Sequence, residues 1–277
     1  MPDFLAYCNG TWTPLAEASV SLADRGFTLG DGLFETLLVR DGRPRLVHAH
    51  LERLGQGAAQ LAIPLPGSAD ALAALLQETA QRNRMGEGSL RLTLTRGVAA
   101  RGLWPEDLGT PTLVIVPGPG RPHFEPLDVV VARSTCRNER SPLSRIKSLN
   151  YLDGILARQE ALGRGADEAI LLNTRGELTE AAIANLFLQM DGEWLTPPVR
   201  DGVLPGVMRG QLLARGFARE ATLTPAAGER AEAALLTSSL SLRPVRTWEG
   251  RSLPRVPDAG WCQTLFQRLL AEAVGNL

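Results

Sequence analysis

Lysine is almost absent from this sequence. Of its 29 basic residues, 28 are arginines and one is a lysine, Lys147. A guanidinium keeps its positive charge but is not a usable amine nucleophile, whereas a primary amine in a shielded site can condense with a carbonyl group to form a Schiff base. Most lysines are solvated surface residues. A sole lysine flanked by Ile146 and Leu149, just before an expected helix, favours a catalytic amine.

Cysteine and histidine are also scarce, with three residues of each. Cys8, Cys136 and Cys262 are far apart and form no CxxC motif. This pattern predicts reduced thiols and argues against a disulfide framework. His48 and His50 precede an expected helix and have no further ligands nearby, so we expect no metal site.

The sequence also has no large excess of charge of either sign and no long apolar run. The net charge is −1, with both signs mixed along the chain, which gives no electrostatic case for nucleic acid or a membrane surface as a partner. The longest apolar runs have only the length of a strand, so no segment is expected to span a bilayer. Residues 1–4 show no basic region followed by an apolar one, so a cytoplasmic protein is expected.

What is present is enough for a large core: 277 residues, 44% of them hydrophobic, predict one or two globular domains. Hydrophobic periodicity predicts helices at residues 50–63, 69–84, 151–162, 207–215, 228–235 and 258–273. Strands are expected at residues 4–14 (a hairpin around Asn9–Gly10), 34–40, 44–47, 90–95, 112–116, 128–132, 168–173, 177–180, 185–190, 194–196 and 236–240, and around a turn at Glu249–Gly250.

This mixture of helices and hairpins favours an α+β fold over a doubly wound parallel sheet. The segment 117–122 is dense in proline and glycine and marks a domain boundary. We expect an N-terminal α+β domain over residues 1–117, a linker over 118–126 and a C-terminal α+β domain over 127–277. The second domain would carry Lys147.

Several residues fit a phosphorylated aldehyde as the partner of the amine. Val207 and Met208 open a helix, and the free amides of a helix start bind phosphate, although most such starts are ordinary. Ser238 lies in a run of three hydroxyl residues, which is often only a turn. Arg53 lies beside the apolar face of its helix, and its planar fork suits a phosphate. The alternative for Arg53 is a surface ion pair with Glu52.

Glu180 is the clearest candidate partner for a charged ring. It ends an expected strand and is followed by small and apolar residues. A carboxylate in such surroundings needs a cation nearby to stay ionised. A pyridinium nitrogen would supply that cation, and the ring would then act as an electron sink. A solvent-exposed glutamate at a hairpin edge is the alternative.

Taken in order, short motifs along the chain resemble those of the fold-type IV pyridoxal-phosphate enzymes, the family of branched-chain and D-amino-acid aminotransferases. Each motif is weak alone, but the ordered set is specific and covers nearly the whole chain. The matching pieces are Asp24–Phe27, Gly30–Thr36, His50–Leu54, Thr95–Gly97, Ile146–Asn150, Gly165–Ala169, Thr179–Glu180, Asn185–Phe187, Thr196–Pro198, and Leu204–Gly206 with Arg209.

The resemblance implies that Lys147 binds pyridoxal 5′-phosphate covalently and later moves protons. It implies that Glu180 contacts the ring nitrogen. The phosphate would be held by Arg53, by the amides of Val207 and Met208, and by Ser238. The substrate would contact Arg101, Glu35 and Thr36. The resemblance also implies two domains with the site between them, and a homodimer in which the partner chain contributes to the site.

Three reactions of this family remain open. The segment Gly32–Thr36 and the run after Glu180 look most like aminodeoxychorismate lyase, which forms 4-aminobenzoate and pyruvate. D-Amino-acid transaminases pair a loop arginine with a histidine two residues on, but here Arg101 is followed by Leu103. Branched-chain transaminases usually have glycine at the position of Thr36. The lyase is therefore favoured, with a transaminase as the alternative and a non-catalytic cofactor-binding protein as a third possibility.

Overall fold

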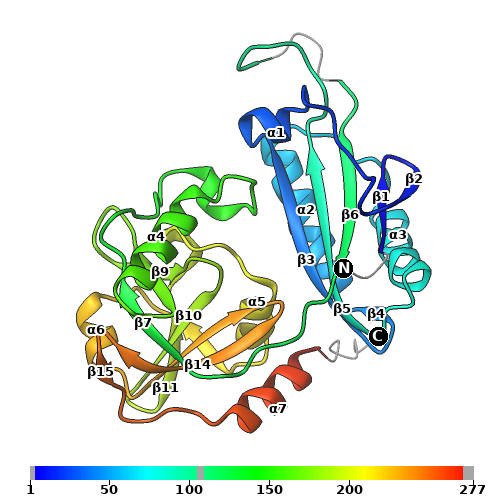
Figure 1. Cartoon of the computed structure of the whole chain (residues 1–277). Helices are drawn as coiled ribbons and strands as arrows, with labels where there is room; N and C mark the ends of the chain where they lie inside the picture. Colours follow the sequence, from blue (N-terminus) through cyan, green and yellow to red (C-terminus); the bar gives the residue numbers. More distant parts are fainter. Residues whose placement is uncertain (1–3, 105–108, 271–277) are drawn as a thin grey trace. The chain divides into compact units, whose positions relative to one another are not determined.

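The computed structural model describes residues 4–104 and 109–270. The chain forms two compact units (Figure 1). The first runs to Arg121 and also includes Ile146–Asn150, and the second contains Pro122–Arg145 and the chain from Tyr151 onward. The division after Arg121 falls within the expected linker. The segment Ile146–Asn150 differs from expectation, because it belongs to the first unit although Lys147 was expected in the second.

The first unit is built on a six-stranded antiparallel sheet. Its strands lie in the order β2-β1-β6-β5-β3-β4. They are β1 (Leu5–Cys8), β2 (Thr11–Pro14), β3 (Gly32–Arg40), β4 (Arg43–Pro44), β5 (Glu87–Thr95) and β6 (Thr112–Gly118). The predicted hairpin around Asn9 and Gly10 is confirmed, and both residues adopt positive φ, as this turn requires.

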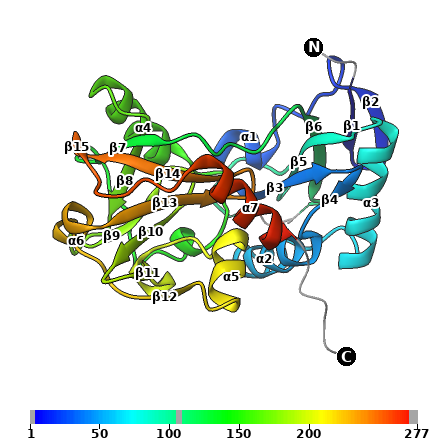
Figure 2. The ribbon, with the colours of Figure 1, turned by 90° about the horizontal axis from the view of Figure 1, so that it is seen from below.

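Helices α2 (Val47–Leu61) and α3 (Ala69–Arg82) cover one face of this sheet (Figures 1 and 2). Alternate leucines of β3 and β5 point toward them and form the core with Leu51, Leu54 and Leu76. Ser68 caps α3 by accepting a hydrogen bond from the amide of Ala71, as its position before the helix predicts.

Two local expectations in this unit need correction. Residues 44–47 were expected to form a strand, but β4 ends at Pro44 and α2 already begins at Val47. No helix was expected between residues 23 and 32, yet Arg25–Leu29 form the short helix α1. Asp24 caps α1 by accepting from the amide of Gly26, and Gly30 ends it in the left-handed conformation.

The second unit is built on a sheet that closes on itself. Its strands are β7 (Leu127–Val131), β8 (Glu168–Leu172), β9 (Leu178–Ala181), β10 (Asn185–Met190), β11 (Glu193–Thr196), β12 (Ala218–Glu220), β13 (Ala233–Ser238), β14 (Ser241–Trp248) and β15 (Arg251–Ser252). The main order is β12-β11-β10-β13-β14-β7-β8-β9. A further pairing between β9 and β10 closes the ring (Figure 1). The pairs β7–β8, β7–β14 and β11–β12 are parallel, and the rest are antiparallel.

Helices and turns cover this ring. They are α4 (Leu152–Gly163), α5 (Val207–Ala214), α6 (Pro225–Arg230), α7 (Ala259–Leu270) and the short 3₁₀ helices η1 (Pro142–Arg145) and η2 (Val199–Asp201). Ala157 and Ala161 of α4 are fully buried against Val130 and Ala169 of the sheet. The last helix was expected to reach residue 273, but residues 271–273 lie outside the described residues.

The helix expected at residues 228–235 is correct only for residues 228–230, the end of α6. Helix α6 ends at Arg230, and strand β13 begins at Ala233. The alanine-rich sequence favours a helix by propensity alone, but Leu235 and Leu236 are buried between β10 and β14. Burial in the centre of a sheet outweighs a helix preference of about 0.5 kcal/mol per residue.

The described residues contain no disulfide, no group of metal ligands and no helix able to span a membrane. Cys8, Cys136 and Cys262 are free thiols. No group of three or more His, Cys, Asp or Glu side chains in the described residues has the spacing of a metal site. None of the helices within residues 4–104 and 109–270 is long and apolar enough to cross a bilayer.

Candidate active site

The segment that carries Lys147 lengthens the sheet of the first unit along the edge of β3. The carbonyl of Lys147 accepts from the amide of Phe34 at 2.9 Å, and the amide of Leu149 donates to the carbonyl of Gly32 at 3.0 Å. Leu33 and Ser148 form an antiparallel bridge between these bonds. The backbone of the lysine is therefore fixed by strand pairing rather than by a free loop.

The amine of Lys147 lies over the aromatic ring of Phe34. Its Nζ is 4.3 Å from the ring centroid, and the guanidinium carbon of Arg91 is 3.7 Å from the same centroid. Arg91 lies opposite Thr36 in the β3–β5 pair, so it shares the face of Phe34. Two cations thus contact one ring. An anion would be attracted to this place, because both nearby charges are positive.

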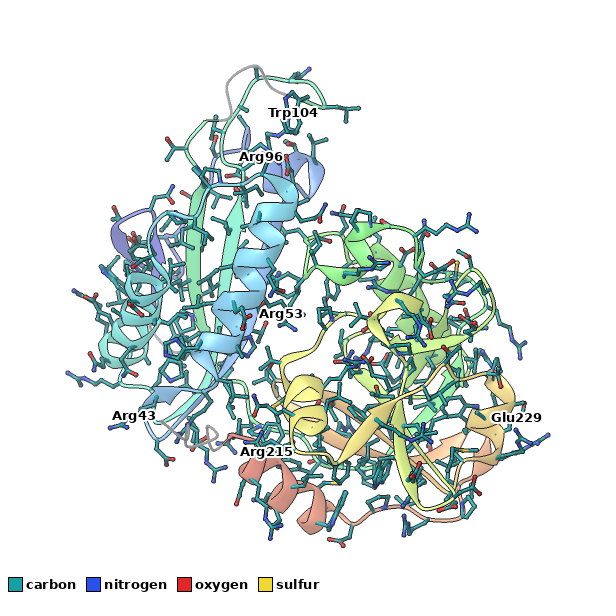
Figure 3. All side chains as sticks on the ribbon, turned by 180° about the vertical axis from the view of Figure 1, so that it is seen from behind. Arg43, Arg53, Arg96, Trp104, Arg215 and Glu229 are labelled. Carbon is teal, nitrogen blue, oxygen red and sulfur yellow. The ribbon has the colours of Figure 1, made fainter. Side chains whose placement is uncertain are left out.

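Glu35 points to the opposite face of β3, toward α2, where it contacts Arg53 (labelled in Figure 3). Arg53 donates from Nε to Oε1 of Glu35 at 2.8 Å and from Nη2 to Oε2 at 2.6 Å. His50 Nδ1 is 2.6 Å from the same Oε2. The ion-pair partner of Arg53 is therefore the distant Glu35, not Glu52 of its own helix.

The protonation states in this cluster follow from its burial. Burial raises the pKa of Glu35, but hydrogen bonds from His50 and Arg53 outweigh it and bring the pKa to about 2. Burial lowers the pKa of His50 below its usual range, and Glu35 opposes this only in part; the charges of Arg53 and Lys147 lower it further. Glu35 is thus ionised, and a neutral His50 donates its Nδ1–H to it.

In the second unit, three predicted strands bring polar side chains into one row. Asn185 pairs in register with Glu180 on one side and with Thr237 on the other. All three side chains are buried. Asn185 Nδ2 donates to Glu180 Oε2 at 3.1 Å and to the carbonyl of Leu204 at 3.0 Å. The hydroxyl of Thr237 has no hydrogen-bond partner among the described residues.

Glu180 receives two further donors. The amide of Leu204 donates to Oε2 at 3.0 Å, and Nη2 of Arg137 lies 3.1 Å from Oε1. A buried carboxylate surrounded by N–H donors and a guanidinium stays ionised. The cation that Glu180 was expected to need is thus supplied at least in part by Arg137.

Helix α5 starts close to this row. Gly206 precedes it, and no described side chain caps its first turn, which contains Val207 and Met208. A β-carbon on Gly206 would come within 1.8 Å of Asn185 Oδ1, so only glycine fits here. Ser238 behaves as a turn residue: its hydroxyl is 2.7 Å from that of Ser241 and accepts from the amide of Leu240.

These residues fit pyridoxal phosphate. The unpartnered buried hydroxyl of Thr237 and the uncapped start of α5 provide hydrogen-bond donors of the kind that bind a phosphate. Glu180 is a buried ionised acceptor suited to a protonated ring nitrogen. Lys147 provides the one primary amine side chain of the sequence. Ser238 stays a predicted phosphate ligand, and Thr237 beside it now fits that role better.

Arg101 lies on a loop that Arg25 and Arg96 hold in place; Arg96 and Trp104 are labelled in Figure 3. Arg25 donates to the carbonyls of Gly102 and Leu103, at 2.8 and 2.7 Å, and Arg96 contacts the ring of Trp104. Arg101 is exposed and makes no hydrogen bond or ion pair with residues 4–104 or 109–270. A cavity of about 540 Å³ is lined by Leu22, Ala23, Arg25, Thr28, Leu29 and Ala99–Leu103.

Sequence reasoning missed Arg91, His50 and Arg137 as members of these clusters, whereas Thr237 belongs to the run of three hydroxyl residues that it had identified. A signal for Arg91 existed, because it alternates with buried Leu90 and Leu92 and therefore faces away from the core. For His50 and Arg137, no local pattern identifies the partner, since each partner lies far away in the sequence.

The comparisons with known proteins agree with this geometry. Residues 32–248 match the family model of class IV aminotransferases. A provisionally named branched-chain-amino-acid aminotransferase of Methanocaldococcus jannaschii is 34% identical over 73% of this chain and 71% of its own length. D-Alanine aminotransferase of Staphylococcus haemolyticus is 31% identical over 73% of this chain and 72% of its own.

Solved structures extend the likeness to nearly the whole chain. A structure from Legionella pneumophila with a provisional title of 4-amino-4-deoxychorismate lyase is 32% identical, covers 92% of this chain and 96% of its own, and has a TM-score of 0.84. A Mycobacterium tuberculosis protein, titled a hypothetical aminotransferase in its pyridoxal-phosphate-bound form, is 25% identical over 96% of this chain and 99% of its own, with a TM-score of 0.82. The fold is therefore of type IV, and the chain belongs to the class IV aminotransferases, a family of pyridoxal-phosphate enzymes.

Proposed function

We propose that this enzyme is an aminodeoxychorismate lyase, which converts 4-amino-4-deoxychorismate into 4-aminobenzoate and pyruvate. The observation that carries this choice is the likeness to the Legionella pneumophila structure, which combines 32% identity with coverage of almost the whole chain. A second lyase structure, from Pseudomonas aeruginosa, is 31% identical over 97% of this chain, whereas a fold IV transaminase from Curtobacterium pusillum is 30% identical over 95% of it. The Gly32–Thr36 segment, which resembles that of the lyase, and Leu103 two residues after Arg101 add support to this choice.

The proposed chemistry assigns one role to each residue of the two clusters. Pyridoxal phosphate, when bound, supplies an electron sink that permits bond cleavage in the substrate. Lys147 would hold the aldehyde group of the cofactor through Nζ and would move protons as general base and acid. Glu180 would accept a hydrogen bond from the ring nitrogen. The phosphate would be held by Arg53, by the amides of Val207 and Met208 at the start of α5, and by the hydroxyls of Ser238 and Thr237.

Substrate recognition is assigned to arginines. Aminodeoxychorismate has two carboxylates, and Arg91 and Arg101 are the two candidates to bind them as planar forks. Arg91 shares the ring of Phe34 with the amine of Lys147, which favours an anionic group near that amine. Thr36 lies opposite Arg91 and stays a candidate contact. For Glu35 the geometry supports a different role, because its oxygens bind Arg53 and His50 under α2.

A D-amino-acid or branched-chain-type aminotransferase is the second candidate. The observations in its favour are relatives of 31% and 34% identity that carry those names. What weighs against a small amino acid as substrate is Leu103, which is 86% exposed on the loop of Arg101 and offers apolar surface instead of a second polar anchor. A cyclohexadiene ring gains more from such a surface than alanine does.

A substrate screen of the purified enzyme tests this proposal. 4-Aminobenzoate, pyruvate and keto-acid formation are measured in parallel with aminodeoxychorismate and with D- and L-amino acids. We expect the specificity constant for 4-aminobenzoate release to exceed that for D-alanine transamination. Arg101→Ala should lower both, and Leu103→His should shift the ratio toward D-amino acids. Efficient transamination without any 4-aminobenzoate would establish the second candidate instead.

The same proposal places the enzyme in the cytoplasm and in the synthesis of folate, because 4-aminobenzoate is a component of folate. We also propose a homodimer. Sedimentation of the purified protein at several concentrations tests the dimer, and a monomer at all concentrations with full activity would contradict it.

A further inference from the structure

Among the described residues, the charged partner of Arg137 is Glu180. Nη2 of Arg137 lies 3.1 Å from Oε1 of Glu180, and the two side chains are 22% and 9% exposed. Within residues 4–104 and 109–270, no other carboxylate comes within ion-pair distance of this guanidinium. We propose that Arg137 is a positioning residue that keeps Glu180 ionised, and thereby keeps the proton on the cofactor's ring nitrogen; this inference rests on the proposed function.

The guanidinium is held in place by neutral acceptors. Nε donates to the carbonyl of Gly202 at 3.1 Å, and Nη2 donates to the carbonyl of Ser144 at 2.6 Å. The backbone of Arg137 is fixed as well, because its amide donates to the carbonyl of Leu172 at the end of β8. These bonds orient the guanidinium without neutralising it, so its charge acts on Glu180.

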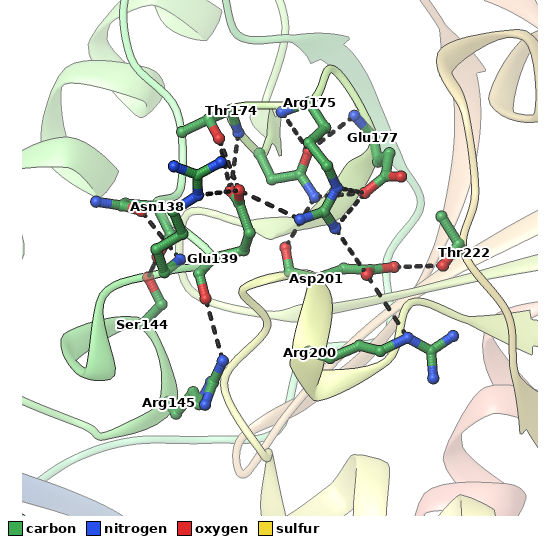
Figure 4. A network of polar contacts seen from close by, with 12 residues as sticks. Asn138, Glu139, Ser144, Arg145, Thr174, Arg175, Glu177, Arg200, Asp201 and Thr222 are labelled. Atoms are coloured by element: carbon green, nitrogen blue, oxygen red, sulfur yellow. Dashed lines mark hydrogen bonds and ion pairs between the residues drawn. The ribbon is translucent and has the colours of Figure 1, made fainter.

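A polar network joins the loop that follows Arg137 to residues near Gly202, and includes Glu139, Ser144, Arg175 and Asp201 (Figure 4). Glu139 accepts from the hydroxyl of Thr174 at 2.7 Å and lies 3.2 Å from Arg175, which in turn contacts Asp201 at 3.0 Å. Ser144 donates its hydroxyl to the carbonyl of Asn138 at 2.7 Å. The loop after Arg137 is thus tied to the turn before β9 and to η2, and the position of the guanidinium is part of that framework.

The charge of Arg137 decides where a shared proton rests. Glu180 already accepts from the amide of Leu204 and from Asn185, and each donor favours its ionised form. A nearby permanent cation favours that form further. A proton between Glu180 and a ring nitrogen is then held by the nitrogen. Without the cation, the proton moves toward Glu180 and the ring loses its positive charge.

The test is the protonation state of the ring nitrogen, measured directly. The parent enzyme and its variants are loaded with pyridoxal phosphate labelled with ¹⁵N in the ring, and the ring-nitrogen resonance is recorded across a pH series. We expect a protonated-type resonance in the parent. Arg137→Gln should shift it toward the unprotonated position, whereas Arg137→Lys, which keeps the charge, should leave it near that of the parent.

Arg164→Gln is the matched control. Arg164 is also a partly buried arginine of the second unit, paired with Glu249 at 2.6 Å and donating to the carbonyl of Val131. This variant should keep the resonance of the parent. A parent-like resonance in Arg137→Gln at every pH would overturn the inference. If that variant does not fold, an unprotonated-type resonance in Arg137→Lys overturns it instead.

The same experiments distinguish a failure of the proposed function from a failure of the role proposed for Arg137. If the parent itself binds no labelled cofactor covalently, the proposed function fails and this inference with it. If the cofactor is bound but Glu180→Gln leaves the ring resonance unchanged, Glu180 does not contact the ring nitrogen, and the role of Arg137 is overturned while the covalent role of Lys147 stands.

Discussion

Each unit of this protein contains a buried arginine–glutamate pair, and the two pairs are built differently. Arg53 and Glu35 of the first unit face each other from a helix and a strand, and their side chains are 9% and 1% exposed. Arg137 and Glu180 of the second unit come from a loop and the end of a strand, and are 22% and 9% exposed. The first pair is fixed by helix-on-sheet packing, the second by hydrogen bonds to backbone.

The Arg53–Glu35 pair supports the fold, whereas the Arg137–Glu180 pair is suited to setting the protonation state of a bound cofactor. Both oxygens of Glu35 bind side chains of α2, so the pair is part of the contact between α2 and β3. Glu180 binds an amide, an asparagine and one guanidinium, in a row that also contains the unpartnered hydroxyl of Thr237. Changes in the first pair should act on stability, and changes in the second on catalysis.

The largest expected effect comes from replacing Lys147, the proposed attachment point of the cofactor. Lys147→Arg keeps the charge but removes the amine nucleophile. We expect loss of all cofactor that borohydride can trap on the protein, and a fall in turnover of at least about 10²-fold, the lower range for a general acid–base group. Mass spectrometry of reduced peptides checks this. Arg145→Lys is the control, since a new lysine two positions away should not be labelled.

The first pair is tested by Arg53→Ala, which leaves Glu35 buried without its arginine. Removing one partner of a buried ion pair costs about 3–5 kcal/mol. Urea unfolding should therefore show a large loss of stability, together with a higher dissociation constant for the cofactor. Arg82→Ala, in an exposed pair with Glu78 on α3, should cost no more than about 1 kcal/mol. Equal losses in both variants would remove the distinction between the pairs.

The second pair is tested by Glu180→Gln. A buried hydrogen bond to a charged group contributes about 1.5–3 kcal/mol, which corresponds to roughly 10–200-fold in rate if the transition state feels it in full. We expect turnover to fall by that factor while the urea midpoint changes little. Glu168→Gln, a buried carboxyl of the same unit beside Arg158, should leave turnover unchanged. An unaltered turnover in Glu180→Gln with cofactor bound would contradict its assignment.

The smallest expected effect is a change in acid stability. The pKa of Glu35 is about 2 in the folded protein against an ordinary value of 4.5, so the unfolded chain binds this proton more readily. Its contribution to stability is therefore complete above pH 4.5 and is lost as the pH falls toward 2. In Glu35→Gln, unfolding free energy should depend less steeply on pH over this window. Glu52→Gln, on the outer side of α2, should keep the slope of the parent.

Sequence patterns were most reliable for elements with local signals. The hairpin at Asn9–Gly10 needs only two residues with positive φ, and α3 starts where Ser68 can cap it. They failed at residues 233–235, where an alanine-rich segment is a strand because the closed sheet of the second unit buries it. They also failed to place Lys147, because strand pairing with Gly32 and Phe34 joins positions more than a hundred residues apart.

Composition and motif order were sufficient to indicate a lysine amine that binds an aldehyde cofactor. One amine among 28 arginines, and a set of motifs in family order, are sufficient to point to a cofactor aldehyde, since composition and order do not depend on distances. Only the tertiary structure decided which charges act on which groups. Arg91 reaches the ring under Lys147, Arg53 reaches Glu35, and Arg137 reaches Glu180, because packing of strands and helices brings together side chains whose separation along the chain gives no sign of contact.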